Sequence, residues 1–383
     1  MADIGSLESF SDFMQATRQL PMSTPDTIMN QSSRHRTYLT RLMMGGLSAE
    51  EYFQGGTEII EQIQLKYTGN ARNYSPTDTQ APSGSNSLTP IKFPWRFKLV
   101  DSVWTDQEII LNGESDTRSM FKRLATVKRQ KMFTDFFDAI NDDVWAAPDS
   151  TQMEGGTSTG SMPYSLRAFI TTAGGAPTAT AVGSGGDGAV QAWTTVATVN
   201  PSTYTNWANA VATYDATSST TIGTSLEGAL EDLTLQLNWE APEDGSGNTG
   251  IDDPGYDKRV ILTNKEGYKY ALQVAKNYWK AIDKKGASLM GLARNGVTFN
   301  GIPIKYISAM DAAGVCASGK PRFYCCDFTF IKLVFHKNRY LYAKSFEGTP
   351  AQPMANVEYR DTWWNLVCTN RRAQGIVVPV SNP

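Results

Sequence analysis

The chain has 383 residues and a formal net charge of -3, so no global basic field marks it as a nucleic-acid binder. Its hydrophobic content of 40% is enough for ordinary buried cores, and its length fits two or three domains. No apolar run reaches the roughly 18 residues that span a bilayer, and the first residues lack the basic and apolar regions of a secretory signal. We therefore expect a soluble protein made in a cytoplasm.

The cysteines and histidines do not form a metal-binding pattern. The chain has four cysteines and two histidines, and no Cys-x-x-Cys pair occurs among them. A zinc site needs several ligands that converge on one point. If the segment around Cys325 and Cys326 is a strand, their side chains point to opposite faces. We expect reduced, structural cysteines and neither a metal nor a cofactor.

Residues 1–56 are predicted to form an N-terminal arm. The segment is polar and interrupted by prolines and glycines, and it holds one short run with helical apolar spacing from Leu7 to Met14. A segment of this kind cannot form its own hydrophobic core. We expect it to remain disordered or to lie on a partner.

Residues 57–101 predict a long two-stranded hairpin with its tip at residues 68–89. From Ile91 to Leu99, apolar residues at odd positions alternate with Lys, Pro and Arg at even positions, as in a strand with one buried face. Pro94 lacks an N–H donor and favours a sheet edge. An isolated hairpin is marginally stable in water, so something outside it must cover the aromatic face. The candidate contacts are Ile63, Leu65, Tyr67, Phe93, Trp95 and Phe97.

Residues 117–146 predict the longest helix. Apolar side chains recur at helical spacing from Phe121 to Val144, and no Pro or Gly interrupts the run. Its first part is basic and its end is acidic, which opposes the helix macrodipole. Two explanations stay open: a partner recognises this charge, or the charge marks a solvated face. The basic candidates for a partner are Lys122, Arg123, Lys128 and Arg129.

Residues 147–223 differ sharply in composition from their surroundings. Gly, Ser, Thr and Ala dominate, and from residue 155 onward charged residues are rare. The composition predicts extended and loop structure that lies over another surface, or a small insertion. Trp193 and Trp207 are its expected anchors.

The rest of the chain predicts α/β structure. Thr224 with Glu227 forms a capping box before one helix, and a second helix is expected to be capped by Thr263 with Glu266 after a short strand. The pair Asn300-Gly301 between short apolar runs is a strong hairpin signal. Strands are expected over residues 322–346 and 357–380, with a turn at Lys337-Asn338.

No catalytic constellation follows from the sequence. The Gly-x-Ser-x-Gly match around Ser158 has neither a strand before it nor a helix after it. The Gly-rich run 183–188 lacks lysine and the context of a phosphate loop. The acidic cluster Asp252, Asp253 and Asp257 misses the spacing of a calcium loop. We expect loops at all three places and no enzymatic activity.

The order of these parts resembles the capsid fold of tailed bacteriophages, often called the Hong Kong 97 fold. The hairpin at 299–304 followed by Met310-Asp311 looks like that family, as does Trp207 with Asn209 ahead of a helix. The best local match is similar to the closing strand of many phage major capsid proteins. It is the run Trp363-Trp364-Asn365-Leu366-Val367-Cys368-Thr369-Asn370-Arg371-Arg372-Ala373-Gln374-Gly375.

The resemblance implies an α+β, Hong Kong 97-like capsid fold with an N-terminal arm, an extended β-hairpin loop, a long spine helix, and peripheral and axial domains. The implied parts begin with an arm at 1–56 and an extended loop at 57–101. A peripheral domain follows at 102–223, with a spine helix at 117–146 and an elaboration at 147–223. An axial domain is implied at 224–345, and C-terminal strands at 346–383 return to the peripheral domain.

The resemblance also implies a function. The protein would be a structural virion protein that self-assembles into hexamers and pentamers of an icosahedral shell around double-stranded DNA, in the cytoplasm of a bacterial host. Expected partners are further copies, a separate scaffolding protein, a portal and, as a further candidate, a decoration protein. The basic part of the spine helix would touch packaged DNA without sequence readout. No membrane partner is expected.

Some members of the family cross-link subunits through a lysine of the extended loop. The predicted tip contains no lysine, so we expect no isopeptide cross-linking here. Two other functions remain open from the sequence. One is a carbohydrate-binding, β-rich surface protein that uses the tryptophans of residues 147–223. The other is an encapsulin-like compartment shell that encloses protein cargo.

Overall fold

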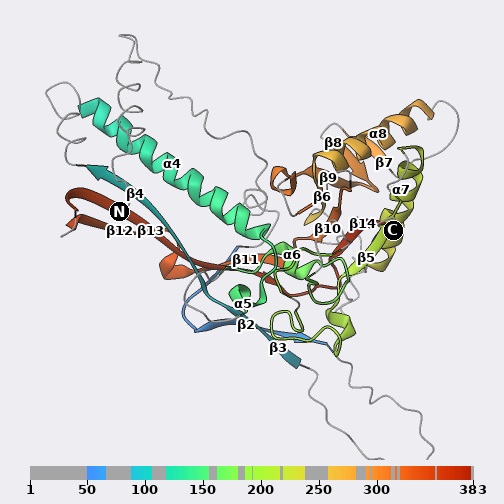
Figure 1. Ribbon diagram of the computed structural model, residues 1–383, viewed down its shortest axis with the longest axis horizontal. Coiled ribbons are helices and arrows are strands. Elements are labelled where there is room, and N and C mark those ends of the chain that lie inside the picture. Colours follow the sequence, from blue (N-terminus) through green and yellow to red (C-terminus); the bar gives the residue numbers. More distant parts are fainter. Residues whose placement is uncertain are drawn as a thin grey trace, which may run out of the picture. The chain divides into compact units, whose positions relative to one another are not determined.

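The computed structural model describes residues 50–65, 88–105, 118–154, 162–179, 186–191, 193–215, 219–237, 258–281, 290–293, 296–311, 315–316, 320–349 and 352–380. All of them lie in one compact unit, residues 37–383. The described residues form a seven-stranded sheet, a five-stranded sheet and a separate two-stranded hairpin, together with long helices (Figure 1). The fold is α+β, as the sequence predicts. The predicted arm up to residue 49 and most of the hairpin tip lie outside the described residues.

The predicted hairpin is confirmed. Strand β2 (Glu58–Gln64) pairs antiparallel with β3 (Leu88–Pro94). The single strand expected over residues 91–99 is wrong in its second half, because the chain leaves the hairpin after Pro94. A new strand, β4 (Arg96–Thr105), enters the five-stranded sheet. Trp95 stands at the break between the two.

The five-stranded sheet is organised around one long strand, β13 (Gln352–Cys368). One side of β13 pairs with β4, and the other pairs with β12 (Tyr342–Thr349) and β11 (Ile331–His336), all antiparallel. Strand β1 (Glu50–Phe53) adds in parallel to β11. A short helix, η7 (Lys337–Arg339), follows β11 where the sequence predicts a turn.

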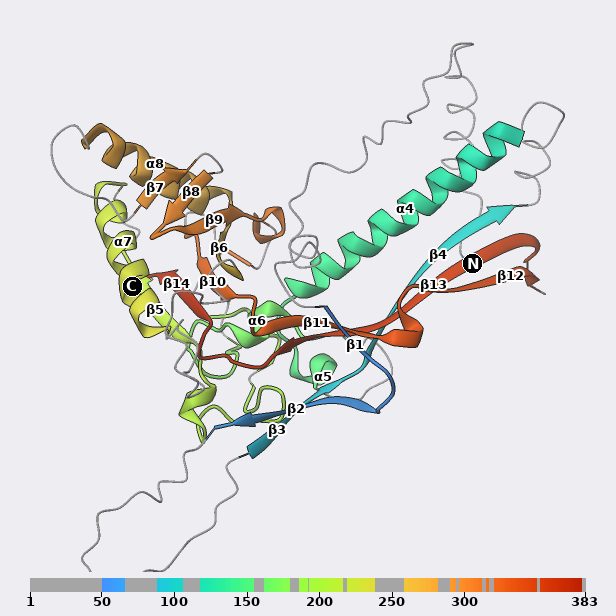
Figure 2. The same ribbon diagram turned by 180° about the vertical axis from the view of Figure 1, so that it is seen from behind.

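The helix predicted over residues 117–146 is confirmed as α4 (Arg118–Val144). Figure 2 shows it running alongside β4. The Lys98 ammonium on β4 pairs with the Asp143 carboxylate at 2.8 Å. A stripe with a spacing of four residues faces the core, as an amphipathic helix requires. Its buried members are Met132, Phe136, Ile140 and Val144.

The seven-stranded sheet has the order β5-β14-β10-β6-β9-β8-β7 and mixes parallel with antiparallel pairs. Its strands are β5 (Ala210–Tyr214), β6 (Arg259–Thr263), β7 (Met290–Ala293), β8 (Gly296–Phe299), β9 (Ile302–Tyr306), β10 (Phe323–Asp327) and β14 (Gly375–Pro379).

Asn300 and Gly301 join β8 to β9 with φ angles of 47° and 81°. Two consecutive positive φ angles define the type I′ turn that the sequence predicts. The short helix η6 (Ser308–Asp311) follows β9.

Two helices pack with this sheet, and both begin elsewhere than expected. Helix α7 (Ser219–Gln236) starts five residues before Thr224, so the predicted capping box lies inside the helix. Helix α8 (Lys265–Ala281) is capped by Asn264, whose side-chain oxygen accepts the Gly267 N–H at 2.9 Å. The predicted cap, Thr263, instead donates its hydroxyl to the Arg322 carbonyl at 3.0 Å, because it still belongs to β6.

The described part of residues 147–223 is mainly irregular, with the short helices α5 (Ser150–Met153), α6 (Leu166–Phe169) and η3 (Thr205–Trp207). Both expected anchors are buried: Trp193 is 6% exposed and Trp207 is 1% exposed. The segment therefore covers another surface of the same chain, as its composition predicts.

Two hydrophobic cores lie on either side of β10. Cys326 belongs to the first core and Cys325 to the second, which confirms that their side chains point to opposite faces. Strand β14, which falls within the predicted C-terminal strands at 346–383, pairs with β10 and β5 in the seven-stranded sheet. Within the part of the chain that the structure describes, no helix is long and apolar enough to cross a membrane.

Candidate assembly surfaces

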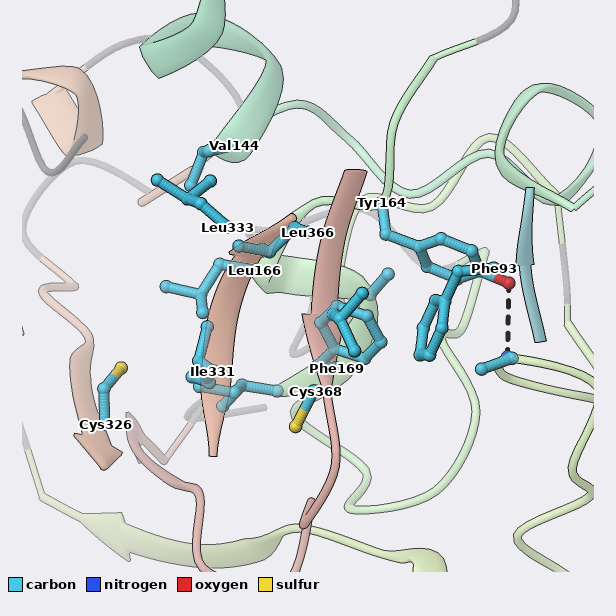
Figure 3. Close-up of a cluster of buried hydrophobic side chains, with 14 of the residues drawn as sticks. Phe93, Val144, Tyr164, Leu166, Phe169, Cys326, Ile331, Leu333, Leu366 and Cys368 are labelled. Carbon is cyan, nitrogen blue, oxygen red and sulfur yellow. Dashed lines mark hydrogen bonds between the residues drawn. The ribbon is translucent and has the colours of Figure 1, made fainter. Parts of the chain in front are cut away.

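The inner face of the hairpin is buried inside its own chain. Ile91 and Phe93 have no exposed surface. The Phe93 ring lies edge-on to the rings of Tyr164 and Phe169, at centroid distances of 5.4 Å and 6.1 Å (Figure 3). Both partners belong to the irregular segment 147–223. This segment supplies the cover that a lone two-stranded hairpin needs.

The structure corrects the expectation that a neighbouring subunit covers the aromatic face. Leu65, Phe93 and Trp95 are each 7% exposed or less within the single chain. Ile63 packs partly against the same core, and Tyr67 lies outside the described residues. A side chain that is already buried within its own chain loses little further exposed area when a neighbouring subunit binds, so it contributes little to association. Of the predicted contacts that the structure describes, only Phe97 remains largely exposed.

The root of the hairpin is fixed by two ring systems. Gly55 and Gly56 connect β1 to β2 with φ angles of 93° and 88°, which glycine adopts more easily than other residues. The Trp95 indole N–H donates to the Gly56 carbonyl at 3.0 Å, and the Gly55 N–H points to Nε2 of His336 at 3.4 Å. The Trp95 and His336 rings meet edge-on at 5.4 Å. This turn therefore holds the hairpin to the end of β11.

A second apolar face lies on the three-stranded part of the sheet formed by β4, β13 and β12. Cross-strand partners share a face. Phe97 lies opposite Trp363, and both Leu99 and Tyr342 lie opposite Asp361. Phe97 and Leu99 are each 57% exposed, and Tyr342 is 49% exposed. We call Phe97, Leu99, Tyr342 and Trp363 the ribbon face.

The ribbon face is ordered by contacts within itself. The Phe97 and Trp363 rings meet edge-on at 4.8 Å. The Arg339 guanidinium lies over the rings of Tyr342 and Trp363, at 4.8 Å and 5.5 Å from their centroids, and approaches the Asp361 carboxylate at 3.7 Å. Aromatic side chains held in place with an arginine among them are typical anchors of protein interfaces.

Comparison with known proteins identifies the fold. No protein-family model and no curated protein matches the chain. Among solved structures, a chain of the cyanophage A-1(L) capsid asymmetric unit matches with a TM-score of 0.56 at 12% identity, over 97% of this chain and 99% of that one. The chain has the capsid fold of tailed bacteriophages. A structure of Gordonia phage Cozz matches with a TM-score of 0.50 at 11% identity, over 100% and 97% of the two chains. The capsid of an empty GTA particle also matches at 0.50 and 11%, over 96% of each chain.

The assignment of the β2–β3 hairpin to the extended loop and of α4 to the spine helix stays a prediction. The C-terminal run that resembles the family has a structural role where the hairpin joins the rest of the chain. The Asn365 side-chain amide donates to the Pro94 carbonyl at 2.7 Å, and its oxygen accepts the Tyr164 N–H at 2.9 Å. Asn365 is fully buried. It joins the end of β3 to the segment that covers Phe93.

Arg371 also holds the segment that covers Phe93, through hydrogen bonds to the backbone of that segment. No role was predicted for Arg371 from the sequence. Its guanidinium is fully buried and donates to the carbonyls of Phe169, Trp207 and Gly175 at 2.8, 3.0 and 2.7 Å. Burial lowers the pKa of Arg371 to about 10. Backbone carbonyls rather than a carboxylate satisfy most of its donors. Its partners are 162 or more residues away in the chain, so no local pattern could reveal this role.

The structure describes the side chain of one of the four basic candidates on α4. The Lys128 ammonium donates to the Val103 carbonyl of β4 at 3.1 Å, so this side chain turns toward the sheet. Contact of Lys128 with packaged DNA stays a prediction. The backbone of Lys122, Arg123 and Arg129 lies in α4, and their side chains lie outside the described ones.

The described residues contain no candidate metal site. No group of three or more His, Cys, Asp or Glu side chains among them could hold a metal ion. Burial raises the pKa of the Cys368 thiol to about 12 and also raises the pKa of Cys326, which disfavours the reactive thiolate. Ser158 and the acidic cluster at 252–257 lie outside the described residues.

Proposed function

We propose that this protein is the structural subunit of a capsid, and that it self-assembles through hexamers and pentamers into an icosahedral shell around double-stranded DNA. The observation that carries the proposal is the match in fold to the cyanophage A-1(L) capsid chain, over 97% of this chain and 99% of that one. The proposed location is the virion, after assembly in the cytoplasm of a bacterial host.

We propose the ribbon face as one surface that a second copy covers. Phe97, Leu99 and Tyr342 project from a sheet whose opposite face carries Lys98, paired with Asp143 on α4. Burying the exposed half of a large apolar side chain contributes about 1 kcal/mol. Such a contribution, repeated in every copy of a closed shell, favours assembly without stabilising the monomer.

The test is assembly of the wild-type chain and of the Phe97→Asp variant, alone and with a co-expressed scaffolding protein. Light-scattering mass and negative-stain images should show rings or closed shells for the wild type and free subunits for the variant. Leu235→Asp is the matched control, because Leu235 is 76% exposed on α7, away from the ribbon face. A wild-type chain that remains monomeric in both preparations would contradict the proposal.

The proposed partners are a separate scaffolding protein, a portal and a decoration protein. Non-specific contact with packaged DNA stays a proposal for Lys122, Arg123 and Arg129 of the spine helix. Neutralising these three residues should reduce the DNA retained in purified particles. Unchanged DNA content would remove this part of the proposal.

Two other functions remain to be compared with this one. A carbohydrate-binding surface would need exposed aromatic rings, and both Trp193 and Trp207 of the Trp-containing segment are buried. The fold match therefore favours a shell protein over a glycan binder. An encapsulin-like compartment is distinguished by its contents: nuclease-protected DNA inside purified particles supports the virion, and co-purified protein cargo supports the compartment.

A further inference from the structure

The imidazole of His336, at the end of β11, lies between two backbone N–H groups. The Gly55 N–H points to its Nε2 atom at 3.4 Å, and the Asn338 N–H points to its Nδ1 atom at 3.3 Å. A neutral imidazole carries a proton on one ring nitrogen and accepts a hydrogen bond only at the other. The ring can therefore satisfy only one of these two N–H groups at a time.

The two tautomers of the ring serve different parts of the chain. With the proton on Nε2, the Nδ1 atom accepts the Asn338 N–H and caps the short helix η7. With the proton on Nδ1, the Nε2 atom accepts the Gly55 N–H and holds the turn between β1 and β2. Each tautomer withdraws the ring from one N–H group in favour of the other.

The surroundings of the ring do not select one tautomer. A carboxylate or carbonyl that accepts a ring N–H fixes the tautomer of a histidine, and no such bond to His336 occurs among the described residues. Gly55 and Asn338 are both exposed, so water is available to whichever N–H the ring releases. The rings of Trp95 and Trp363 hold the imidazole in place at 5.4 Å and 5.2 Å, and they leave the position of its proton open.

The two N–H groups belong to the two surfaces described above. Gly55 lies in the turn that holds the hairpin to β11, beside Trp95. Asn338 lies in η7, which also carries Arg339. The Arg339 guanidinium lies over two rings of the ribbon face, at 4.8 Å and 5.5 Å from their centroids. His336 therefore lies between the hairpin root and the ribbon face.

We infer that His336 is a switch that couples the ribbon face to the hairpin root through the tautomer of its ring. The inference rests on the proposed function, in which a second copy covers the ribbon face. Contacts that order η7 favour the tautomer that accepts the Asn338 N–H, and they withdraw the acceptor from Gly55. By linkage, a bond from Gly55 to the ring weakens association at the ribbon face by the same factor.

Two substitutions separate the two states. In His336→Asn the side-chain oxygen can take the place of Nδ1, and in His336→Gln it can take the place of Nε2. Both variants lose the same ring contacts and present the same amide, so each is the matched control for the other. In free subunits, the Gly55 amide should exchange its hydrogen about threefold or more faster in His336→Asn than in His336→Gln, and the Asn338 amide should show the reverse order.

Assembly gives a second readout for the same pair. His336→Asn keeps only the acceptor that caps η7, so it should assemble most readily. The subunit concentration at half-assembly should be about fivefold or more lower for His336→Asn than for His336→Gln. The wild type should lie between the two variants, because its ring divides its time between the two N–H groups.

The tautomer itself can be observed in the chain with an unchanged His336. We would label the histidines with ¹⁵N and use His35→Gln to remove the signals of the other histidine. The two ring nitrogens of His336 then report which of them carries the proton. At about pH 8, above the range in which imidazoles usually titrate, free subunits should show both tautomers. Assembled particles should show mainly the tautomer with the proton on Nε2.

The outcomes separate the switch from the proposed function. If the wild type does not assemble, the proposed function fails and the coupling fails with it. If the wild type assembles but the two variants do so at the same concentration, or the tautomers are the same in free subunits and particles, the coupling is overturned and the proposed function stands. A single tautomer in free subunits would overturn the switch in either case, and this measurement decides alone should the two variants fail to fold.

Discussion

Two halves of one alternating run have opposite environments. Ile91 and Phe93 are completely buried, whereas Phe97 and Leu99 are each 57% exposed. All four occupy odd positions in the same apolar–polar alternation. The change occurs at the break after Trp95, where Arg96 becomes buried and its guanidinium donates to the Met153 carbonyl at 2.5 Å. A period-two pattern shows that one face is apolar, and it does not show what covers that face.

The difference follows from what lies beside each half. The inner face of the hairpin is covered by the nearly uncharged segment 147–223, which brings Tyr164 and Phe169 against Phe93. On β4, the opposite face of the sheet is occupied by the spine helix through Lys98 and Asp143. The ribbon face is left exposed. Intrachain cover thus stabilises the folded chain, and the uncovered half remains exposed to solvent.

The largest expected effect tests this division directly. Phe93→Ala should lower the free energy of unfolding of the free subunit by about 3–5 kcal/mol, because it removes a ring from a fully packed site. Phe97→Ala should cost less than about 1 kcal/mol in the same measurement, because the ring is mostly solvated. Urea unfolding below the assembly concentration measures both. Equal losses for the two variants would contradict the division into covered and uncovered halves.

The next effect tests how the covering segment is attached. Asn365→Ala removes the hydrogen bonds to the Pro94 carbonyl and the Tyr164 N–H and leaves both groups buried without a partner. We expect a loss of about 1–3 kcal/mol in subunit stability and faster proteolysis near the hairpin root. Asn370→Ala is the control, since its side chain accepts only the exposed Arg372 N–H at 3.1 Å in this structure. Equal losses of stability for Asn365→Ala and Asn370→Ala would contradict the role of Asn365 in holding the covering segment to the hairpin.

Local signals predicted much of the fold. The apolar spacing of α4, the Asn300-Gly301 turn and the β2–β3 hairpin depend on residues close in sequence, and the structure confirms all three. Helix α7 shows the limit of local rules, because it extends through Gly223 to Ser219 although Thr224 suggests a cap. Packing against the sheet overrides a weak capping preference.

The candidate surfaces were harder to predict, because their partners are remote in the chain. Lys128 has the same charge as its helical neighbours, yet its ammonium bonds to the backbone of β4. Arg371 belongs to a run that resembles the capsid family, but its partners, including Phe169 and Trp207, lie in another segment. Composition identified that segment as a cover, and only the three-dimensional arrangement shows that it covers its own hairpin.

The smallest expected effect concerns a carboxyl beneath the covering segment. Burial raises the pKa of Glu154 above its ordinary value of 4.5, although the hydroxyls of Thr195 and Tyr164 donate to it at 3.0 and 3.1 Å. A raised pKa in the folded state means that its contribution to stability is present at low pH and is lost as pH rises through the folded pKa. The free energy of unfolding should therefore fall slightly as the pH rises from acid to neutral.

Glu154→Gln should remove that pH dependence, because the amide does not titrate. The difference in unfolding free energy between the wild type and the variant should shrink steadily, or change sign, as pH rises from about 4 to about 7. Glu231→Gln on α7 is the control for the change from carboxylate to amide, since the Glu231 side chain is exposed. Urea unfolding of the free subunit across this range is the measurement. A difference that stays constant with pH would mean that Glu154 is equally solvated in both states, and that the segment over Phe93 is a looser cover than its contacts indicate.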